Sequence, residues 1–435
     1  MTTNKVINYV KPDILLQKIN ECDTFSEFSE IFETYNVNTQ HPYFLNQLFG
    51  NTDHYIASID HMLIEYNTSA YTYEISPVFT LMEIEIVKKM LSKVGYVGGD
   101  GFFCSGGSIS NLYGMFLARH NFNNTIKSDG NICNLIGYVS DHAHYSFTKN
   151  ANLMGIGENN IIKISTINGK MDIVDLENNI KHKRPFFVNA TIGTTVLGSF
   201  DDIVEIHHIC KKYDIWLHID ACFGGAMLYI DDNLLRSIQL SDSISWNFHK
   251  VLGFNMQCSL FMTKHKNILK ESTYLNINYL FNEENRMYDE EYDIGRKTLF
   301  CGRKADAAKL YIADAILTES YFIDKVHFLI SKRNQLVNDL TALHSFKLVT
   351  IPEYLNVCFW FNPENLAEKK LSDFTVKIRQ QMINRGNVMI GIHTVKLNGT
   401  NLPYFFRVVV INNIESSHII KELYECYYSL QQHTY

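Results

Sequence analysis

From residue 76 onward, short apolar runs alternate with segments of helical periodicity, and this alternation constrains the fold more than any other feature of the sequence. Five apolar runs are typical of buried strands: residues 134–140, 160–166, 185–191, 215–220 and 259–263. Three segments between them have helical spacing: residues 108–120, 172–182 and 202–213. Because strands and helices alternate, we expect an α/β fold with a mostly parallel central sheet covered by helices on both faces.

The sequence divides into three predicted parts. Residues 1–75 contain helical pieces but no strand rhythm, so we expect an N-terminal helical arm that packs on something larger. Residues 76–340 form the predicted large domain. Residues 341–435 alternate strand-like and helical runs, and they predict a small α+β C-terminal domain.

Local patterns add detail to this plan. Residues 166–170 (TINGK) predict a hairpin turn. The polar stretch within 265–300 predicts a functional loop, and a long helix is expected from about 303 to 345. In the tail, we expect strands at 356–361 and 405–411, a helix near 370–385 and a final helix.

Composition excludes several classes of function. The formal net charge is -7 and there is no basic run, so we expect no nucleic-acid partner. No apolar run approaches the ~20 residues that a membrane-spanning helix needs, and the N-terminus has no signal-peptide pattern. The nine cysteines are scattered without a CxxC pair, which is typical of reduced thiols in the cytoplasm.

Polar residues follow several predicted strands, where open α/β sheets bind ligands. Gly107 and Ser108 lie in a Gly-Gly-Ser turn that opens a helix, which could bind an anion or simply cap the helix. Asp220 ends the run 215–220, so its carboxylate needs a cationic or N–H partner. Lys250 lies in an aromatic and apolar run, either in solvent or as a desolvated nucleophile.

Other charged and polar groups follow the same logic. His142 and His144 come after the run 134–140, and His218 and Asp220 share one face of their strand. A metal is an alternative for either pair, and a satisfied core histidine is a further alternative for His142 and His144. For His218 and Asp220, only these two ligand-type residues lie close together. We therefore predict no metal. Arg407 is a lone charge in an apolar strand, which suggests an anion partner.

These parts together suit one cofactor type, a phosphorylated pyridine aldehyde. The phosphate needs an anion site, the ring nitrogen needs a carboxylate, the ring face needs a flat partner, and the aldehyde needs a lysine. The sequence offers a candidate for each of them.

The chain resembles the group II pyridoxal-phosphate-dependent amino acid decarboxylases, in the branch of glutamate and cysteine sulfinate decarboxylases. The resemblance runs from about His41 to near the C-terminus. It is carried by several stretches in this order: HPYFLNQLF, YTYEISPVFTLME, SGGSISNLYGMFLAR, FVNATIGTTVLGSFDDI, WLHIDACFGG, SWNFHKVLGFNMQCS, YLFN, FCGR, NVCFWF and FFRVVV. It implies fold type I of the pyridoxal-phosphate enzymes, which is aminotransferase-like, and a homodimer with interlocked N-terminal arms.

The resemblance implies pyridoxal 5'-phosphate as cofactor and gives roles to matching residues. Lys250 would bind the cofactor as a Schiff base, Asp220 would pair with the ring nitrogen, and His144 would stack on the ring. The remaining positions that would surround the cofactor are Gly107, Ser108 and His249 at the phosphate with Asn247 nearby, Thr191 beside the O3′ side, Cys222 opposite His144, and Cys301 and Gly302 toward the partner subunit's phosphate.

The same resemblance implies the residues that would handle the substrate, an amino acid that loses its α-carboxylate as CO2. Arg407 would bind the α-carboxylate, and Gln47 would contribute from the arm. Tyr279 resembles the loop tyrosine that returns a proton to the α-carbon. Because enzymes of the family with this tyrosine usually release the amine, Tyr279 favours plain decarboxylation over aldehyde-forming oxidative decarboxylation.

Three positions depart from the family pattern. Phe248 stands where proline is usual before His249-Lys250, and Cys222 stands in a segment that usually reads Asp-Ala-Ala-Trp. His393 stands where glutamine is usual, in a segment that borders the substrate pocket. If these departures abolish activity, the chain would be a catalytically inactive relative that keeps the fold.

The substrate is predicted from three further positions. Phe49, Ser69 and Tyr71 resemble the cysteine sulfinate branch, whereas glutamate decarboxylases tend to carry a smaller residue, Asn and Phe at these places. We therefore expect a small acidic L-amino acid, with cysteine sulfinate giving hypotaurine or aspartate giving β-alanine. Glutamate giving GABA is the alternative.

Overall fold

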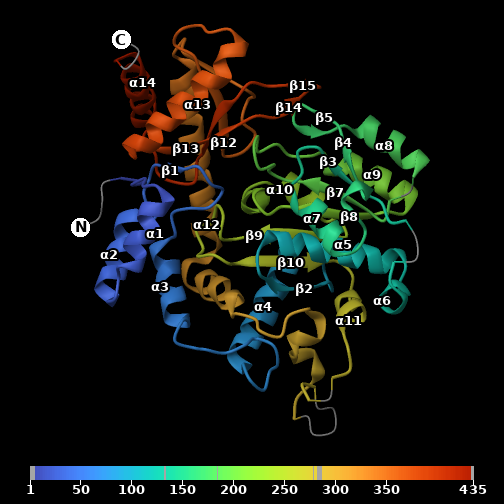
Figure 1. Cartoon of the computed structure of the whole chain (residues 1–435). Helices are drawn as coiled ribbons and strands as arrows, with labels where there is room; N and C mark the ends of the chain where they lie inside the picture. Colours follow the sequence, from blue (N-terminus) through green and yellow to red (C-terminus); the bar gives the residue numbers. More distant parts are fainter. Residues whose placement is uncertain (1–4, 132–133, 184, 278, 282–286, 433–435) are drawn as a thin grey trace. The chain divides into compact units, whose positions relative to one another are not determined.

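A computed structural model describes residues 5–131, 134–183, 185–277, 279–281 and 287–432. The chain forms two compact units (Figure 1). The seven-stranded unit comprises residues 52–195 and 199–326, and the five-stranded unit comprises residues 1–51, 196–198 and 327–435. The boundaries predicted above for three domains stay a prediction.

The seven-stranded unit is built on one mostly parallel sheet, as the alternating pattern predicts. Its strands, in spatial order, are β2 (Asp100–Cys104), β10 (Ser259–Thr263), β9 (Ser243–Asn247), β8 (Trp216–Asp220), β7 (Phe187–Thr191), β3 (Gly137–Ser140) and β4 (Ile161–Ile164). β10 runs antiparallel to both of its neighbours, while the strands from β9 to β4 are mutually parallel. Every residue of β7, β8 and β9 is buried, which is typical of a sheet covered on both faces.

Helices connect and cover these strands. They are α3 (His54–Leu63), α4 (Pro77–Lys93), α5 (Gly107–Phe122), α6 (Ile126–Asp129), α7 (Ser146–Leu153), α8 (Ile173–His182), α9 (Ile203–Tyr213), α10 (Asp232–Ile238) and α11 (Ile268–Thr273). Figure 1 shows α5 lying against the sheet, where it contacts β7, β8, β9 and β10. Side-chain caps set several helix starts: Asp202 accepts a hydrogen bond from Glu205 N at 3.1 Å before α9.

The five-stranded unit contains a second, mainly antiparallel sheet. Its strands, in spatial order, are β1 (Phe44–Leu45), β13 (Met389–His393), β16 (Phe405–Val409), β12 (Asn356–Phe361) and β11 (Phe346–Leu348). Its helices are α1 (Pro12–Asn20), α2 (Phe25–Tyr35), α13 (Glu368–Arg385) and α14 (Ser416–Gln432), and β14 (Lys396–Leu397) pairs with β15 (Thr400–Asn401). A continuous apolar core under this sheet includes Phe359, Phe406 and Val408.

Most predicted elements are confirmed, and the differences have physical causes. The hairpin at 166–170 is the pair β5 (Thr166–Ile167) and β6 (Lys170–Met171), whose turn residues Asn168 and Gly169 both have positive φ. The arm is not purely helical, because Phe44 and Leu45 form β1 by pairing with β13. A two-residue strand stabilised by a partner about 345 residues away leaves no periodicity in the sequence.

The predicted polar loop is described in part. Residues 278 and 282–286 lie outside the described residues, and short 3-10 turns η3 (Glu290–Tyr292) and η4 (Ile294–Lys297) follow. The long helix α12 (Asp306–Thr341) is interrupted at Thr318, where φ is 65°. Among the described helices, none combines the length and apolarity that crossing a membrane requires.

Candidate active site

The topology brings the predicted cofactor residues to one edge of the seven-stranded sheet. The strands β3, β7, β8 and β9 are parallel, so their carboxyl ends lie at the same edge, and β2 points the same way because β10 is antiparallel to both β2 and β9. In register, Thr191 pairs with Asp220 and Asp220 pairs with Ser245. Lys250 follows β9 directly, and His144 follows β3. This edge is where open α/β sheets bind ligands.

Asp220 is a buried carboxylate whose hydrogen bonds come from neutral donors. Asn111 Nδ2 donates to Asp220 Oδ2 at 2.9 Å, and Cys222 N donates to Asp220 Oδ1 at 3.0 Å. Burial opposes ionisation, but the nearby Lys250 and these donors outweigh it, so the pKa of Asp220 lies below its usual value. Asp220 is therefore a fixed negative charge at the edge of the sheet.

His144 and Lys250 lie within electrostatic range of Asp220. Burial and the nearby Lys250 lower the pKa of His144, so its ring is neutral near pH 7. The backbone N–H of Ser146 donates to His144 Nδ1 at 3.3 Å, which orients the ring. Both His144 and Lys250 are half-buried, so each can be reached by a ligand.

The N-terminus of α5 forms a cradle beside these groups. Gly106 precedes the helix with φ 96°, a conformation that favours glycine. A Cβ on Gly107 would come within 2.6 Å of Cys222 Sγ and 2.7 Å of Asn247 Nδ2, so only glycine permits this approach. Ser108 is exposed in the first turn. The first amides of a helix have no acceptor within the helix, so this end of α5 can bind an anion.

His249 and Phe248 are both buried in the turn between β9 and Lys250. His249 Nδ1 lies 2.9 Å from the Cys258 carbonyl oxygen, and burial lowers the pKa of His249 to about 4. Phe248 N donates to that same carbonyl at 2.9 Å, which a proline cannot do. The Phe248 ring stacks on Trp246 with centroids 4.7 Å apart. The departure at Phe248 is therefore compensated by backbone bonding and aromatic packing.

Pyridoxal 5'-phosphate fits this donor set. The α5 end can bind its phosphate, Asp220 can pair with its ring nitrogen, the flat neutral ring of His144 can face the pyridine, and Lys250 can react with its aldehyde. A Cβ on Gly107 would clash with Cys222 and Asn247, so the start of α5 lies this close to the ends of β8 and β9 only because Gly107 has no side chain. Thr191, whose hydroxyl accepts from Asn189 Nδ2 at 3.1 Å, lies one strand away from Asp220.

A second group of predicted residues gathers around Arg303. Ser69 Oγ donates to the Cys301 carbonyl at 2.6 Å and accepts from Arg303 N at 3.1 Å. Tyr71 stacks on Phe281 with centroids 5.6 Å apart and lies within electrostatic range of Cys301 and Tyr279. Tyr279 is 86% exposed. Ser69, Tyr71 and Cys301 thus interact with one another and with Arg303, and these contacts do not involve Asp220.

Cys301 and Gly302 lie at the exposed rim of this second group. A Cβ on Gly302 would meet nothing within 4 Å, so the backbone faces open space there. This exposure leaves both residues accessible to another molecule.

The remaining substrate residues lie in the five-stranded unit. Arg407 on β16 is buried, and its Nη2 donates to the Asn46 carbonyl at 2.6 Å. Burial lowers the pKa of Arg407 to about 10, so the guanidinium is still protonated at pH 7. Gln47 is exposed beside Asn46, and Phe49 packs against Phe44 at 6.2 Å.

His393 lies next to Arg407 in this sheet. Gly391 pairs with Arg407, and a Cβ on Gly391 would come within 2.8 Å of His393 Nε2. Burial, and then the Arg407 charge, lower the pKa of His393 to about 4. The residue that departs from the family pattern is therefore a neutral imidazole beside the predicted carboxylate-binding arginine.

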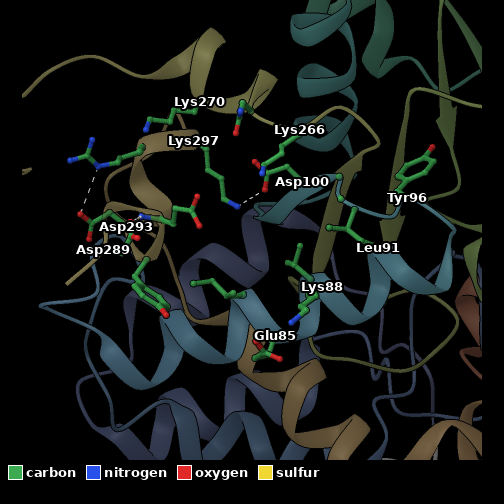
Figure 2. A pocket seen from close by; sticks show the side chains of 18 of the residues that line it. Glu85, Lys88, Leu91, Tyr96, Asp100, Lys266, Lys270, Asp289, Asp293 and Lys297 are labelled. Carbon is green, nitrogen blue, oxygen red and sulfur yellow. Dashed lines mark hydrogen bonds and ion pairs between the residues drawn. The ribbon is translucent and has the colours of Figure 1, made fainter.

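A cavity of about 700 Å³ lies elsewhere in the seven-stranded unit (Figure 2). It is lined by α4, the start of β2, α11, η3 and η4, and the described lining contains none of the predicted site residues. Lys297 reaches across to Asp100 at 2.5 Å, and Glu290 pairs with Lys270 at 2.6 Å and with Arg296 at 2.8 Å. These pairs neutralise much of the charge on the walls.

Three residues that shape the site were missed or read differently in the sequence. Asn111 and Arg303 lie within quoted family stretches but carried no predicted role. His218 was weighed as a metal ligand with Asp220, but Asn111 bridges the two side chains. Asn111 comes four positions after Gly107, so helical spacing already places it on the same face of α5. Across the part of the chain described, no cluster of three metal-ligating side chains is found.

The chain is similar to known proteins in sequence and in structure. Residues 10–362 match the family model described as the pyridoxal-dependent decarboxylase conserved domain. The chain is 38% identical over 399 residues to acidic amino acid decarboxylase GADL1 of Bos taurus, covering 87% of this chain and 75% of that protein. It is 37% identical over 398 residues to cysteine sulfinic acid decarboxylase of Homo sapiens, covering 87% and 80%.

A solved structure supports the same assignment. The crystal structure of mouse CSAD superposes with a TM-score of 0.90 at 33% sequence identity, covering 97% of this chain and 93% of that one. This match shows the predicted fold type I. The chain belongs to the pyridoxal-dependent decarboxylase family, and it is a group II amino acid decarboxylase that uses pyridoxal 5'-phosphate as its cofactor.

Proposed function

We propose that this enzyme removes the α-carboxylate of a small acidic L-amino acid, cysteine sulfinate or aspartate, and releases CO2. The observation that carries the proposal is the combination of Phe49, Ser69 and Tyr71 with the two relatives described above, whose names specify acidic amino acids and cysteine sulfinic acid. Hypotaurine or β-alanine would be the product.

The proposed cofactor site uses the edge of the seven-stranded sheet. Lys250 would bind the cofactor covalently, Asp220 would hold a proton at the ring nitrogen, and His144 would cover the ring face. The residues around the remaining atoms are Gly107, Ser108 and His249 at the phosphate, Asn247 near it, Thr191 at the O3′ side and Cys222 opposite His144. When bound, pyridoxal 5'-phosphate supplies an electron sink for the pair left by departing CO2.

The proposed substrate residues supply charge and a proton. Arg407 keeps its positive charge at pH 7 and would bind the substrate's α-carboxylate, with Gln47 beside it. His393 stays neutral, so Arg407 and His393 together offer the α-carboxylate one positive charge rather than two. Tyr279 would donate a proton to the α-carbon, which releases the product as an amine.

We also propose that the enzyme is a homodimer. Tyr279, Cys301 and Gly302 are exposed, although the proposed roles require contact with substrate or phosphate. A second copy that receives these residues would supply that contact.

The eight cysteines that the structure describes are free, which supports a cytoplasmic location.

A substrate panel tests the proposal. CO2 release from cofactor-loaded enzyme would be measured with cysteine sulfinate, aspartate, cysteate, glutamate and aromatic L-amino acids. One methylene in a pocket discriminates by about 10- to 200-fold, so kcat/KM should favour cysteine sulfinate or aspartate over glutamate by at least ~10-fold. Lys250→Ala is the control, because it should lose both activity and the cofactor's absorption band near the visible edge.

The alternative outcomes separate the parts of the proposal. Faster turnover of glutamate than of both shorter acids would refute the substrate class and leave the family assignment intact. No CO2 from any amino acid, with the absorption band present in the wild type, would show that the chain is an inactive relative.

A further inference from the structure

A buried chain of hydrogen bonds leads from Trp216 to Asp220. Trp216 Nε1 lies 2.9 Å from Ser243 Oγ, which lies 2.8 Å from His218 Nδ1. His218 Nε2 lies 3.1 Å from Asn111 Oδ1, and Asn111 Nδ2 lies 2.9 Å from Asp220 Oδ2. All five side chains are buried, so these bonds form away from water.

The chemistry of the two ends fixes the direction of every bond. The indole nitrogen of Trp216 can only donate, so the Ser243 hydroxyl accepts from it and keeps its own proton for an unprotonated His218 Nδ1. The ionised Asp220 can only accept, so Asn111 presents its amide nitrogen to Asp220 and its carbonyl oxygen to His218. His218 must therefore carry its proton on Nε2. Four donors in series point toward the Asp220 carboxylate, and such chains strengthen one another.

Packing holds the His218 ring in the orientation that this chain needs. A Cβ on Gly114 would come within 2.5 Å of His218 Nδ1, so α5 crosses directly over the ring. Phe261 stacks on the His218 ring with centroids 6.3 Å apart. The Ser245 hydroxyl, 3.3 Å from His218 Nε2, is a second acceptor for the same proton. Burial lowers the pKa of His218 to about 4, so the ring is neutral at pH 7.

The bond from His218 adds to the bond from Asp220 in fixing which way the Asn111 amide points. Asn111 Nδ2 also lies 3.0 Å from Ser146 Oγ, and Ser146 N donates to His144. With the His218 donor present, a flipped Asn111 would place its amide nitrogen against an N–H and its oxygen against the Asp220 carboxylate. Both contacts are repulsive. Without that donor, only the bonds at one end of the amide resist the flip.

We propose that His218 is a positioning residue for the cofactor: by donating from Nε2 it orients Asn111, which holds Asp220 ionised and directed at the ring nitrogen of pyridoxal 5'-phosphate. This inference rests on the role proposed above for Asp220. It assigns a function to a histidine that does not itself contact the cofactor.

The test is the protonation state of the ring nitrogen in the holoenzyme. The protein would be loaded with pyridoxal 5'-phosphate labelled with ¹⁵N in the ring, and the ¹⁵N chemical shift would be followed against pH. In His218→Leu, which has no donor, Asn111 can turn its amide nitrogen away from Asp220. Loss of the ring proton should then move to lower pH by up to about two units, the effect of one lost hydrogen bond to a charged group. His218→Gln can place an amide N–H near the Nε2 position, so it should restore wild-type titration.

A matched control removes a buried hydrogen bond outside the chain. Tyr96→Phe deletes the bond between Tyr96 and Ser241, which are 2.5 Å apart in the same unit, and the ring nitrogen should titrate as in the wild type. If His218→Leu does not fold, Ser243→Ala replaces it, because without the serine hydroxyl the imidazole proton can move to Nδ1. The same downward shift is then expected.

The outcomes distinguish the inference from the role of Asp220. A downward shift in His218→Leu or Ser243→Ala, with wild-type titration in His218→Gln and Tyr96→Phe, supports the inference. If the ring nitrogen titrates as in the wild type in His218→Leu, or in Ser243→Ala where His218→Leu does not fold, His218 only packs against its neighbours and the inference is wrong. An unprotonated ring nitrogen in the wild type at pH 7 would overturn the role proposed for Asp220 as well.

Discussion

The ion pair between Glu83 and Arg303 is buried in the seven-stranded unit, and its removal tests how the second group of residues is held. Arg303 Nη2 lies 2.5 Å from Glu83 Oε1 and 3.0 Å from the Phe103 carbonyl oxygen. Arg303 Nη1 donates to the Ala70 carbonyl. The two charged side chains are 2% and 5% exposed, so solvent does not screen the pair. Arg303 thus links α4, β2 and the segment that carries Ser69.

The expected cost follows from leaving one charge alone. Glu83→Ala strands the Arg303 charge and also removes the acceptor of Phe103 N, which lies 2.8 Å from Glu83 Oε1. Breaking a buried pair in this way costs about 3–5 kcal/mol. The unfolding entropy of a chain of 435 residues is about 0.9 kcal/mol/K, so Tm should fall by about 3–6 °C. Glu83→Gln keeps an acceptor for Phe103 N, so its Tm should fall by less than that of Glu83→Ala.

Thermal unfolding of the cofactor-free protein at one fixed scan rate measures this loss. The matched control is Asp314→Asn, which breaks a second ion pair made by α4, between Lys89 and Asp314 at 2.6 Å. Lys89 is 49% exposed, so that pair is worth at most about 1 kcal/mol and Tm should change by about 1 °C. If Glu83→Ala has the same Tm as the wild type, or if Asp314→Asn lowers Tm by as much as Glu83→Ala does, burial does not explain the contribution of the Glu83–Arg303 pair to stability.

Three further predictions concern the proposed site. Tyr279→Phe removes the proposed proton donor, so amine formation should fall by about 10²–10⁴-fold while oxygen consumption and ammonia release appear, as measured with an oxygen electrode and an ammonia assay. Burial lowers the pKa of His218 and of His249 to about 4, from 6.5, so stability is complete above pH 6.5 and is lost as pH falls toward 4. Unfolding at pH 5 should therefore bind about three extra protons, at these two groups and at His393, whose pKa is also about 4. Calorimetry in buffers of different ionisation enthalpy measures this uptake, and His218→Gln should reduce it by about one proton. Phe248→Pro restores the usual family residue, yet it should destabilise this protein by about 3–5 kcal/mol, because it removes a fully buried ring and the backbone bond to the Cys258 carbonyl. Phe248→Leu keeps that bond, so it should destabilise the protein less in the same thermal unfolding assay.

The sequence predicts the layout of the sheet well because the layout depends on local patterns. Buried parallel strands require continuous apolar runs, and the runs ending at Thr191 and Asp220 are β7 and β8 within two residues of the expected bounds. The carboxyl ends of parallel strands share one edge by topology alone. Asp220, His144 and Lys250 could therefore be placed together before any coordinates were known.

What the sequence could not show are the pairings made across long separations. The contact between His218 and Asn111 joins residues 107 positions apart, and it depends on the rotation of α5 about its axis and on the register of β8. Apolar periodicity gives the buried face of each element but not which polar side chain it meets. The same limit hid Arg303, whose partners Glu83 and Ala70 lie more than 200 positions away.

Two of the buried acids of this unit, Glu83 and Asp220, show how partner choice separates a structural role from a functional one. Glu83 pairs with the guanidinium of Arg303, a permanent counter-ion. Because Arg303 already neutralises its charge, Glu83 would attract a cationic ligand only weakly. Asp220 is held by the amide of Asn111 and the backbone of Cys222, which satisfy the lone pairs needed to keep it ionised without cancelling its charge. A carboxylate that must stabilise a protonated pyridine is best hydrogen-bonded by neutral donors, because a cation bonded directly to it would compete with the pyridine. The neutral His218, which supports Asn111 while adding no charge, is consistent with that requirement.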